Sequence, residues 1–269
     1  MINKYFKNMK KPHLIPKKIL LKLFGIYSKM NYSAQKYLEE QEKEFITLGL
    51  DRGKGLIKLN NLKDKYSCIE KPMSSEHQIL FSSLSVKENI LDVLEIGTFD
   101  GTNAFLLSKL FDKAKIETMD LNDEDPIFKE TYGRKNINKF KDFCDQRNKI
   151  LNQSNNINFI KKNSMKLIFS DKKYDLIWID GAHGYPTAAI DITNCLRLVK
   201  PNGIIVCDDV WVNTPVNQDG TYNSVATFEV LTALKNAGII NFNLIYKRLD
   251  KENNAVKRLR KYIAYTKLN

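Results

Sequence analysis

Residues 93–102, with the sequence Val-Leu-Glu-Ile-Gly-Thr-Phe-Asp-Gly-Thr, decide the fold class of this 269-residue chain. An apolar run carries an acid, Glu95, and is followed by two glycines, Gly97 and Gly101, before a helical pattern begins at Thr102. Glycine at these points permits a tight turn and lets a ligand approach the main chain closely. The stretch is therefore typical of a buried strand, a binding loop and a helix in succession.

The same succession of apolar run, turn and helical pattern recurs along the chain. Parallel strands are buried on both faces and need crossover helices, so the alternation predicts an α/β, doubly wound, mostly parallel sheet. The runs expected as strands are 90–96, 115–119, 157–160, 174–179, 203–206, 242–246 and 262–266. The direction of the last two stays open. The lysine-rich link between them, 247–261, is expected to be a solvated hairpin connection.

The chain is expected to have three regions. Residues 1–38 form a basic N-terminal arm, because they hold nine lysines and no acid, which leaves 12 − 9 = +3 of the formal charge of +12 for the rest. Residues 39–75 form a helical and irregular extension, with a charged helix over 33–47 and irregular chain over 50–75. Residues 76–269 form the α/β domain.

The basic charge lies in the arm and forms no stripe on the folded body, so DNA is not expected as a partner and RNA is disfavoured. Residues 16–30 predict a basic amphipathic helix. Its apolar side is formed by Leu20, Leu23, Phe24 and Tyr27. Docking of this side on the protein's own body is favoured, and contact of residues 1–30 with an anionic membrane surface is the alternative.

The cysteines and apolar runs indicate the compartment. Cys68, Cys144, Cys195 and Cys207 show no CxxC spacing and no disulfide-scaffold density, which fits a reducing environment. No run has the length of a membrane span or the form of an export signal. The sequence predicts a cytoplasmic protein, whose arm would meet the inner face of the membrane if it meets one. A homo-oligomer stays open.

An acid follows the glycine loop at the distance expected of a nucleotide-binding unit. Asp120 ends the second apolar run, 23 residues after Gly97, and an acid about twenty residues after such a loop binds a ribose diol. A dinucleotide loop would need glycine where Phe99 stands, and Asp100 would repel a pyrophosphate. A neutral or cationic nucleoside ligand fits better.

The motif Glu95-x-Gly97-x-x-x-Gly101, together with Asp120, resembles the S-adenosylmethionine loop of the class I methyltransferases. The resemblance implies that residues 76–269 are an S-adenosylmethionine-binding catalytic domain. It also implies a Rossmann-like, seven-stranded sheet whose last strand is antiparallel.

The resemblance assigns roles to further positions. The loop, including Thr98, would face the methionine part of the cofactor, with Asp180 beside it, and Asp120 would hold the ribose hydroxyls. Asn163 and Ser164 stand where the family contacts adenine. The family often has aspartate at the first of these two positions, so Asn163 is a departure, although its amide can both donate and accept hydrogen bonds.

Two more strand ends carry acids. Asp180 follows the run 174–179, and Asp208 and Asp209 follow the run 203–206. The carboxyl ends of parallel strands meet at the edge where ligands bind, so the three carboxylates are expected to converge. Gathered like charges repel one another, and a divalent cation such as Mg²⁺ would relieve the repulsion. Asp208 and Asp209 reach one ion only if the chain leaves strand geometry there.

One of the three histidines, His183, lies three residues after Asp180 and beside glycine. A neutral imidazole is a suitable proton acceptor near pH 7, and a metal-bound hydroxyl is more acidic than a free one. We therefore expect Asp180 and His183 to be catalytic and Asp180, Asp208 and Asp209 to bind the metal. The alternative, that the acids cap helices and His183 is a surface residue, is disfavoured because the motifs occur together.

The pattern Asp180-Gly-Ala-His183 with Asp208-Asp209 resembles the metal-dependent O-methyltransferases that modify sugars on macrolide and aminocoumarin natural products. This resemblance implies Mg²⁺ or another divalent cation, His183 as the base, and a saccharide or glycosylated metabolite as the acceptor. The catechol-type enzymes share the metal edge but usually have Asp-Asn in place of Asp208-Asp209.

The loop 211–223 and the insert 122–155 are expected to shape the acceptor pocket and to act as a lid. Three other functions stay open. The basic arm, residues 1–38, is the reason to consider an RNA methyltransferase. The predicted metal site is the reason to consider a catechol-type small-molecule O-methyltransferase. The glycine loop alone would also fit a nucleoside-binding scaffold without enzymatic activity.

Overall fold

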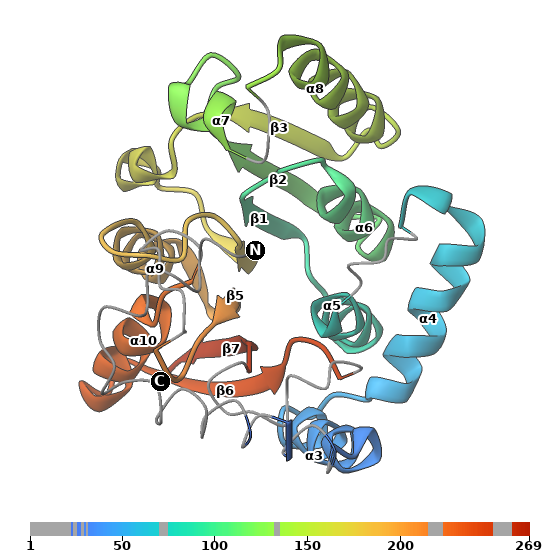
Figure 1. The fold of residues 1–269 in the computed structure, drawn as a ribbon, viewed down its shortest axis with the longest axis vertical. Helices are drawn as coiled ribbons and strands as arrows, with labels where there is room; N and C mark the ends of the chain where they lie inside the picture. Colours follow the sequence, from blue (N-terminus) through green and yellow to red (C-terminus); the bar gives the residue numbers. More distant parts are fainter. Residues whose placement is uncertain are drawn as a thin grey trace.

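The computed structural model describes residues 32–69, 75–131, 135–214, 223–249 and 260–269, together with Leu23, Ile26, Tyr27 and Met30. Within these residues one seven-stranded sheet has the order β3-β2-β1-β4-β5-β7-β6, and only the pairings of β7 are antiparallel (Figure 1). The strands are β1 (Asp92–Ile96), β2 (Lys115–Asp120), β3 (Ile157–Lys161), β4 (Tyr174–Ile179), β5 (Val199–Val210), β6 (Ile240–Tyr246) and β7 (Tyr262–Leu268). The predicted fold class is confirmed, including the antiparallel last strand.

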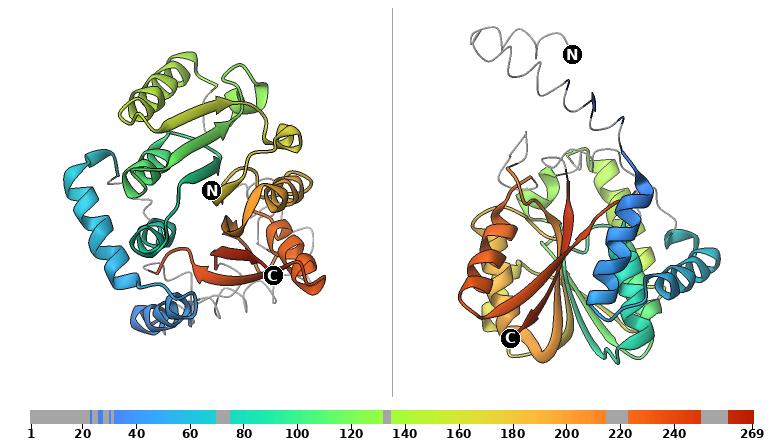
Figure 2. Two further views of the ribbon diagram at one scale, coloured as in Figure 1. Left: turned by 180° about the vertical axis from the view of Figure 1, so that it is seen from behind. Right: turned by 90° about the horizontal axis from the view of Figure 1, so that it is seen from below.

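Helices cover both faces of the sheet (Figure 2). They are α3 (Ala34–Thr47), α4 (Arg52–Lys65), α5 (Glu76–Lys87), α6 (Thr102–Leu110), α7 (Pro126–Glu130), α8 (Ile137–Leu151), α9 (Thr187–Leu198) and α10 (Ala226–Asn236), with 3₁₀ turns η2 (Ser67–Ile69) and η3 (Ser164–Phe169). Strand β4 shows why the strands are apolar throughout: Leu176 and Trp178 enter the core under α4, α5 and α6, whereas Ile177 and Ile179 enter the core under α9 and α10.

A helix occupies most of the segment 50–75 that was expected to be irregular. Helix α4 begins at the cap of Asp51, whose carboxylate accepts a hydrogen bond from the backbone N–H of Lys54 at 2.9 Å. Its second glycine, Gly55, is buried against α5, where a Cβ would lie 2.0 Å from the Ser83 hydroxyl. The expectation of irregular chain is therefore wrong for most of this segment, where Gly55 lets two helices pack closely.

The extension is fastened to the end of β6. Gln41 of α3 pairs with both backbone groups of Tyr246, accepting from its N–H at 2.8 Å and donating to its carbonyl at 3.1 Å. Gln41 also donates to Glu76 at 3.2 Å, and Arg52 of α4 donates two hydrogen bonds of 2.9 Å to the same carboxylate. These contacts bind α3, α4 and α5 to the carboxyl edge of the sheet.

Most of the arm lies outside the described residues. Leu23, Ile26, Tyr27 and Met30 are helical and exposed, with 48–80% of their surface accessible. The docking expected of the helix 16–30 and the membrane alternative both stay predictions. Among the described helices, none combines the length and the apolar character that a bilayer span requires.

Substitution of Gly55 by alanine tests the close packing of α4 on α5. The added methyl group would meet the Ser83 hydroxyl at 2.0 Å and the Ile79 carbonyl at 2.8 Å, so we expect a loss of about 1–3 kcal/mol in the free energy of unfolding, measured by urea denaturation. Gly53→Ala is the matched control, because this exposed position of the same helix has space for a methyl group. Equal effects of the two substitutions would refute the packing argument.

Candidate functional site

The loop between β1 and α6 lies against the end of β4. Gly97 has φ +102°, and a Cβ there would stand 2.3 Å from the Asp180 carbonyl oxygen. Its N–H donates to the Met119 carbonyl at 2.8 Å, which joins the ends of β1 and β2. Gly101 begins α6 with φ +78°, where a Cβ would be 2.9 Å from Leu151. Both glycines are required by backbone conformation and close contact.

Glu95 lies beneath this loop and supports it. The fully buried carboxylate accepts hydrogen bonds from Asn103 at 2.8 Å and from the Thr118 hydroxyl, which in turn pairs with the Thr98 hydroxyl at 2.6 Å. Burial raises the pKa of Glu95 to about 7 against the opposing effect of these hydrogen bonds. Glu95 and Thr98 hold the loop from below and do not line the cavity described next.

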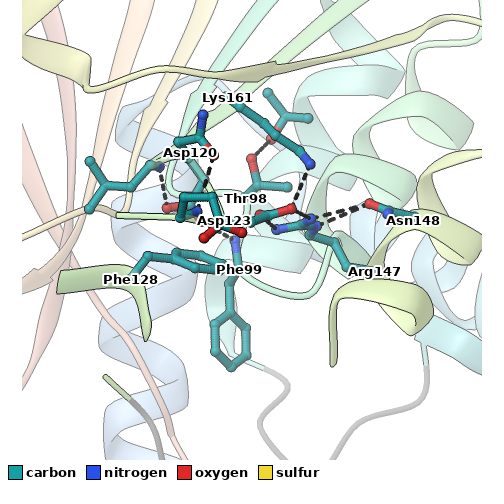
Figure 3. A network of polar contacts seen from close by, with 12 residues as sticks. Thr98, Phe99, Asp120, Asp123, Phe128, Arg147, Asn148 and Lys161 are labelled. Atoms are coloured by element: carbon teal, nitrogen blue, oxygen red, sulfur yellow. Dashed lines mark hydrogen bonds and ion pairs between the residues drawn. The ribbon is translucent and has the colours of Figure 1, made fainter. Parts of the chain in front are cut away.

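A cavity of about 350 Å³ opens beside the loop, within the size range of small-molecule sites. Its wall includes, among other residues, Gly97, Asp120, Asn163, Ser164, Asp180 and Asp191. Asp120 ends β2, and its carboxylate accepts from the N–H groups of Phe99 at 2.9 Å and Leu121 at 2.8 Å (Figure 3). The structure thus brings the acid predicted for the ribose to the wall of one cavity with the glycine loop.

The cavity wall also contains an acid, Asp191, that was not predicted from the sequence. Asn163 caps η3 by accepting from the Met165 N–H at 2.9 Å, and Ser164 follows it. Beside them, Asp191 of α9 is fully buried, and neither carboxylate oxygen has a hydrogen-bond partner of normal geometry among the described residues, although Ser164 is close enough to interact with it. Burial raises its pKa to about 6, while Ser164 acts to lower it. An acid within the apolar stripe 188–199 was the signal that could have identified it.

An ion-pair cluster fixes the part of the insert 122–155 that borders the cavity. The fully buried Arg147 of α8 donates to Asp123 at 2.9 and 3.1 Å, and Lys161 at the end of β3 donates to the same carboxylate at 2.5 Å (Figure 3). The guanidinium lies over the Phe159 ring, 4.6 Å from its centroid, and 5.7 Å from that of Phe128, which lines the cavity. This part of the insert therefore forms part of the cavity wall. Its role as a lid stays a prediction.

The chain leaves strand geometry at Asp209, as the convergence of Asp208 and Asp209 requires. Asp209 has φ +50°, and the pairing of β5 with β7 shifts register between Cys207 and Val210. The local bulge turns two successive carboxylates toward the same neighbour instead of to opposite faces.

That neighbour is a lysine. Lys247 Nζ donates to Asp208 at 2.5 Å and to Asp209, and Lys261 Nζ donates to the other oxygen of Asp209 at 2.6 Å. Because β6 ends at Tyr246 and β7 begins at Tyr262, both lysines stand at the carboxyl edge of the sheet. The link 247–261 was expected to be solvated, but Lys247 at its start is 8% exposed. The middle of the link lies outside the described residues.

The electrostatics of this edge follow from burial and from Lys247. Burial and the neighbouring Asp208 raise the pKa of Asp180 well above its ordinary value, against the influence of Lys247. Burial opposes ionisation of Asp208, but Lys247 and His77 outweigh it and hold the pKa of Asp208 well below its usual range. Burial also opposes the charge of Lys247, yet Asp208 and Asp209 raise its pKa. The Lys247 ammonium and the Asp208 carboxylate are therefore charged at neutral pH.

His183 is buried beside these groups. Its Nε2 lies 3.6 Å from Asp180 Oδ1, and 6% of the residue is exposed. Burial lowers the pKa of His183, although Asp209 and Asp208 oppose the shift. The imidazole is accordingly neutral near pH 7 and able to accept a proton. Asp180 joins the two parts of the site, because it lines the cavity and also adjoins His183.

The donor set does not fit a divalent cation in this arrangement. Mg²⁺ requires carboxylate oxygens at about 2.0–2.1 Å in octahedral geometry, but Lys247 and Lys261 already occupy both oxygens of Asp209 and one of Asp208. Among the described residues, no group of three or more histidine, cysteine or acidic side chains is placed to hold a metal ion. The structure brings the three predicted ligands together and supplies lysine as their counter-charge.

Residues 94–210 match a family model described as a methyltransferase domain. The fold is shared with a cofactor-bound protein from MTB, Rv0187, at a TM-score of 0.53 and 15% identity over 80% of this chain and 89% of that one. It is also shared with the O-methyltransferase TomG from Streptomyces achromogenes, involved in tomaymycin synthesis and solved with S-adenosylmethionine. That match has a TM-score of 0.53 and 15% identity over 86% of this chain and 99% of TomG. No curated protein matches the sequence.

The match to the methyltransferase model covers residues 94–210, and the fold is the Rossmann-like fold of the similar structures. The prediction of an S-adenosylmethionine-dependent methyltransferase is confirmed at this level. The roles of individual site residues stay predictions.

Replacement of Glu95 by glutamine tests the buried acid under the loop. A folded-state pKa of about 7, above the unfolded value, means that Glu95 contributes stability that is complete below the unfolded pKa and lost as the pH rises through 7. Relative to Glu95→Gln, the ligand-free wild type should lose about 3 kcal/mol of unfolding free energy between pH 4.5 and 7.5. Urea denaturation at a series of pH values measures this, and parallel stability curves for the two proteins would contradict it.

Asp191→Asn tests whether the unpaired carboxylate serves the ligand. The change removes a buried charge without a partner, so the ligand-free protein should be as stable as the wild type or more stable. Its dissociation constant for S-adenosylhomocysteine should nevertheless rise about tenfold, because a hydrogen bond to a charged acceptor is lost. Isothermal titration together with thermal unfolding separates the two effects, and unchanged affinity would show that Asp191 does not contact the nucleoside.

Proposed function

We propose that this chain is an S-adenosylmethionine-dependent O-methyltransferase whose acceptor is a polyhydroxylated small molecule, a saccharide or a glycosylated metabolite. The observation that carries the proposal is the placement of Asp180. It forms part of the nucleoside cavity wall and lies 3.6 Å from His183, a buried and neutral histidine. A cofactor in the cavity and a proton acceptor next to Asp180 in the cavity wall are the two parts that methyl transfer to oxygen requires.

The cofactor, when bound, supplies an electrophilic methyl group on a sulfonium. Asp120 would hold the ribose hydroxyls, and Gly97 would let the methionine part pass close to the main chain, where a side chain would collide with the Asp180 carbonyl. His183 would take the proton of the acceptor hydroxyl. Its burial keeps bulk water away from the imidazole, so that the hydroxyl of the acceptor is the group it meets.

The proposal that the methyl group goes to oxygen and the proposal that the acceptor is a saccharide have different grounds. The fold shared with TomG, itself an O-methyltransferase, favours oxygen as the receiving atom. The resemblance of Asp180-Gly-Ala-His183 to sugar-modifying enzymes favours a saccharide. Mg²⁺ does not enter the proposal, because the carboxylates that would hold it are paired with lysine. Within the described residues, no observation favours RNA or a catechol over a saccharide.

His183→Ala tests the proposed base. We expect the rate of methyl transfer to fall about 10²–10⁴-fold, while the dissociation constant for S-adenosylhomocysteine stays within twofold of the wild type. The measurement is transfer of labelled methyl from S-adenosylmethionine to a panel of mono- and oligosaccharides, catechols and RNA, paired with isothermal titration. Full activity of the variant would exclude His183 as the base, and selective methylation of RNA or catechols would replace the proposed acceptor.

A further inference from the structure

The acidic edge of the site contains its own cation. Three carboxylates, Asp180, Asp208 and Asp209, meet at the ends of β4 and β5, and the Nζ of Lys247 hydrogen-bonds two of them. Lys261 binds the remaining oxygen of Asp209 at 2.6 Å. Two ammonium groups thus face three carboxyl groups, one of which, Asp180, has a raised pKa.

Backbone contacts on both sides fix Lys247 in this position. Its N–H donates to the Lys261 carbonyl at 3.0 Å, and its own carbonyl accepts from the N–H of Glu76 at 2.9 Å. The preceding residue, Tyr246, is held by Gln41 through both of its backbone groups. The ammonium of Lys261 lies 5.3 Å from the centroid of the Trp211 ring. The lysines are therefore parts of a built site and not surface side chains that happen to fold over it.

We propose that Lys247, supported by Lys261, takes the place of a divalent cation at this edge, so that the protein binds its acceptor without a metal. The inference rests on the proposed methyl transfer and specifies how the acceptor is held there. A metal chelates two oxygens of the acceptor, whereas this site offers a fixed charge and hydrogen-bonding groups.

Asp208 Oδ1 shows what kind of acceptor these groups can bind. This buried oxygen has no hydrogen-bond partner of normal geometry among the described residues, although the neighbouring Asp180 carboxyl is close enough to interact with Asp208. Oδ2 is bound to Lys247. A hydroxyl next to the reacting one can donate to Oδ1, while the reacting hydroxyl donates to His183. The site therefore binds a neutral acceptor with at least two neighbouring hydroxyl groups, and it binds them through hydrogen bonds and not through a shared metal ion.

The transfer step is balanced without a metal. The oxygen of the reacting hydroxyl forms a bond to the methyl carbon, the bond between that carbon and sulfur breaks, and its electron pair goes to sulfur, leaving a neutral thioether. The hydroxyl proton passes to the imidazole of His183. Lys247 keeps its proton throughout, since it acts as a positioning residue that holds Asp208 and Asp209 and supplies positive potential near the developing charge on oxygen.

The test uses the full chain with Mg²⁺, Mn²⁺ and S-adenosylhomocysteine as separate probes in isothermal titration. The wild type should bind S-adenosylhomocysteine equally well with and without EDTA and should show no heat of binding for either metal up to millimolar concentration. Lys247→Met leaves two acids without their shared ammonium, so it should gain Mn²⁺ affinity by at least tenfold and should be stabilised by Mn²⁺ in thermal unfolding. Lys247→Arg keeps the charge and should gain nothing.

Lys200→Met is the matched control, because Lys200 also pairs with two aspartates, Asp92 at 2.7 Å and Asp175 at 2.9 Å, but away from the site. This variant should lose stability without gaining Mn²⁺ affinity. Metal binding by the wild type, or equal Mn²⁺ affinity in Lys200→Met and Lys247→Met, would overturn the inference. If Lys247→Met does not fold, the wild type and Lys247→Arg still give the answer. Failure of S-adenosylhomocysteine to bind the wild type would instead refute the proposed function.

Discussion

The neutralisation of three carboxylates at one end of a parallel sheet is the constraint on which the arrangement of the site depends. Strands β4 and β5 deliver Asp180, Asp208 and Asp209 to one edge, and their mutual repulsion would oppose folding in the absence of a counter-charge. The counter-charge comes from Lys247 and Lys261, which flank the antiparallel pair β6 and β7. The acidic ends of β4 and β5 therefore depend on β6 and β7, because Lys247 directly follows β6 and Lys261 directly precedes β7.

Much of the fold, and the positions of several candidate site residues in it, could be predicted from local sequence. The apolar runs, the glycine loop and the acid after β2 are recognisable because each depends on residues within about thirty positions of one another. The bulge at Asp209 was anticipated as a condition for the meeting of two successive acids. These features are properties of single strands and their ends, and strand ends at the carboxyl edge of a parallel sheet have predictable neighbours.

The features that were missed depend on tertiary contacts. Lys247 and Asp208 are 39 positions apart in the sequence, and they meet because of the order of the strands in the sheet. The sequence left the direction of β6 and β7 open, so this pairing could not be predicted from it. Helix α4 was missed within a segment expected to be irregular, and its Gly55 leaves space for Ser83 of another helix. Asp191 was concealed within an apolar helical stripe. In each case the local pattern was ambiguous, and the packing partner determined the outcome.

The fastening of β6 by Gln41 has a consequence for the ancestry and engineering of such domains. Gln41 holds the backbone of Tyr246, the residue before Lys247, and Gln41 belongs to α3, which precedes the α/β domain in the sequence. A recombination event that exchanged the domain from residue 76 onward would transfer the glycine loop and Asp120 intact. The end of β6 would, however, lose its hydrogen bonds with Gln41. The cavity beside the glycine loop is thus portable between proteins, whereas the charged edge is inherited only together with the helices that precede it.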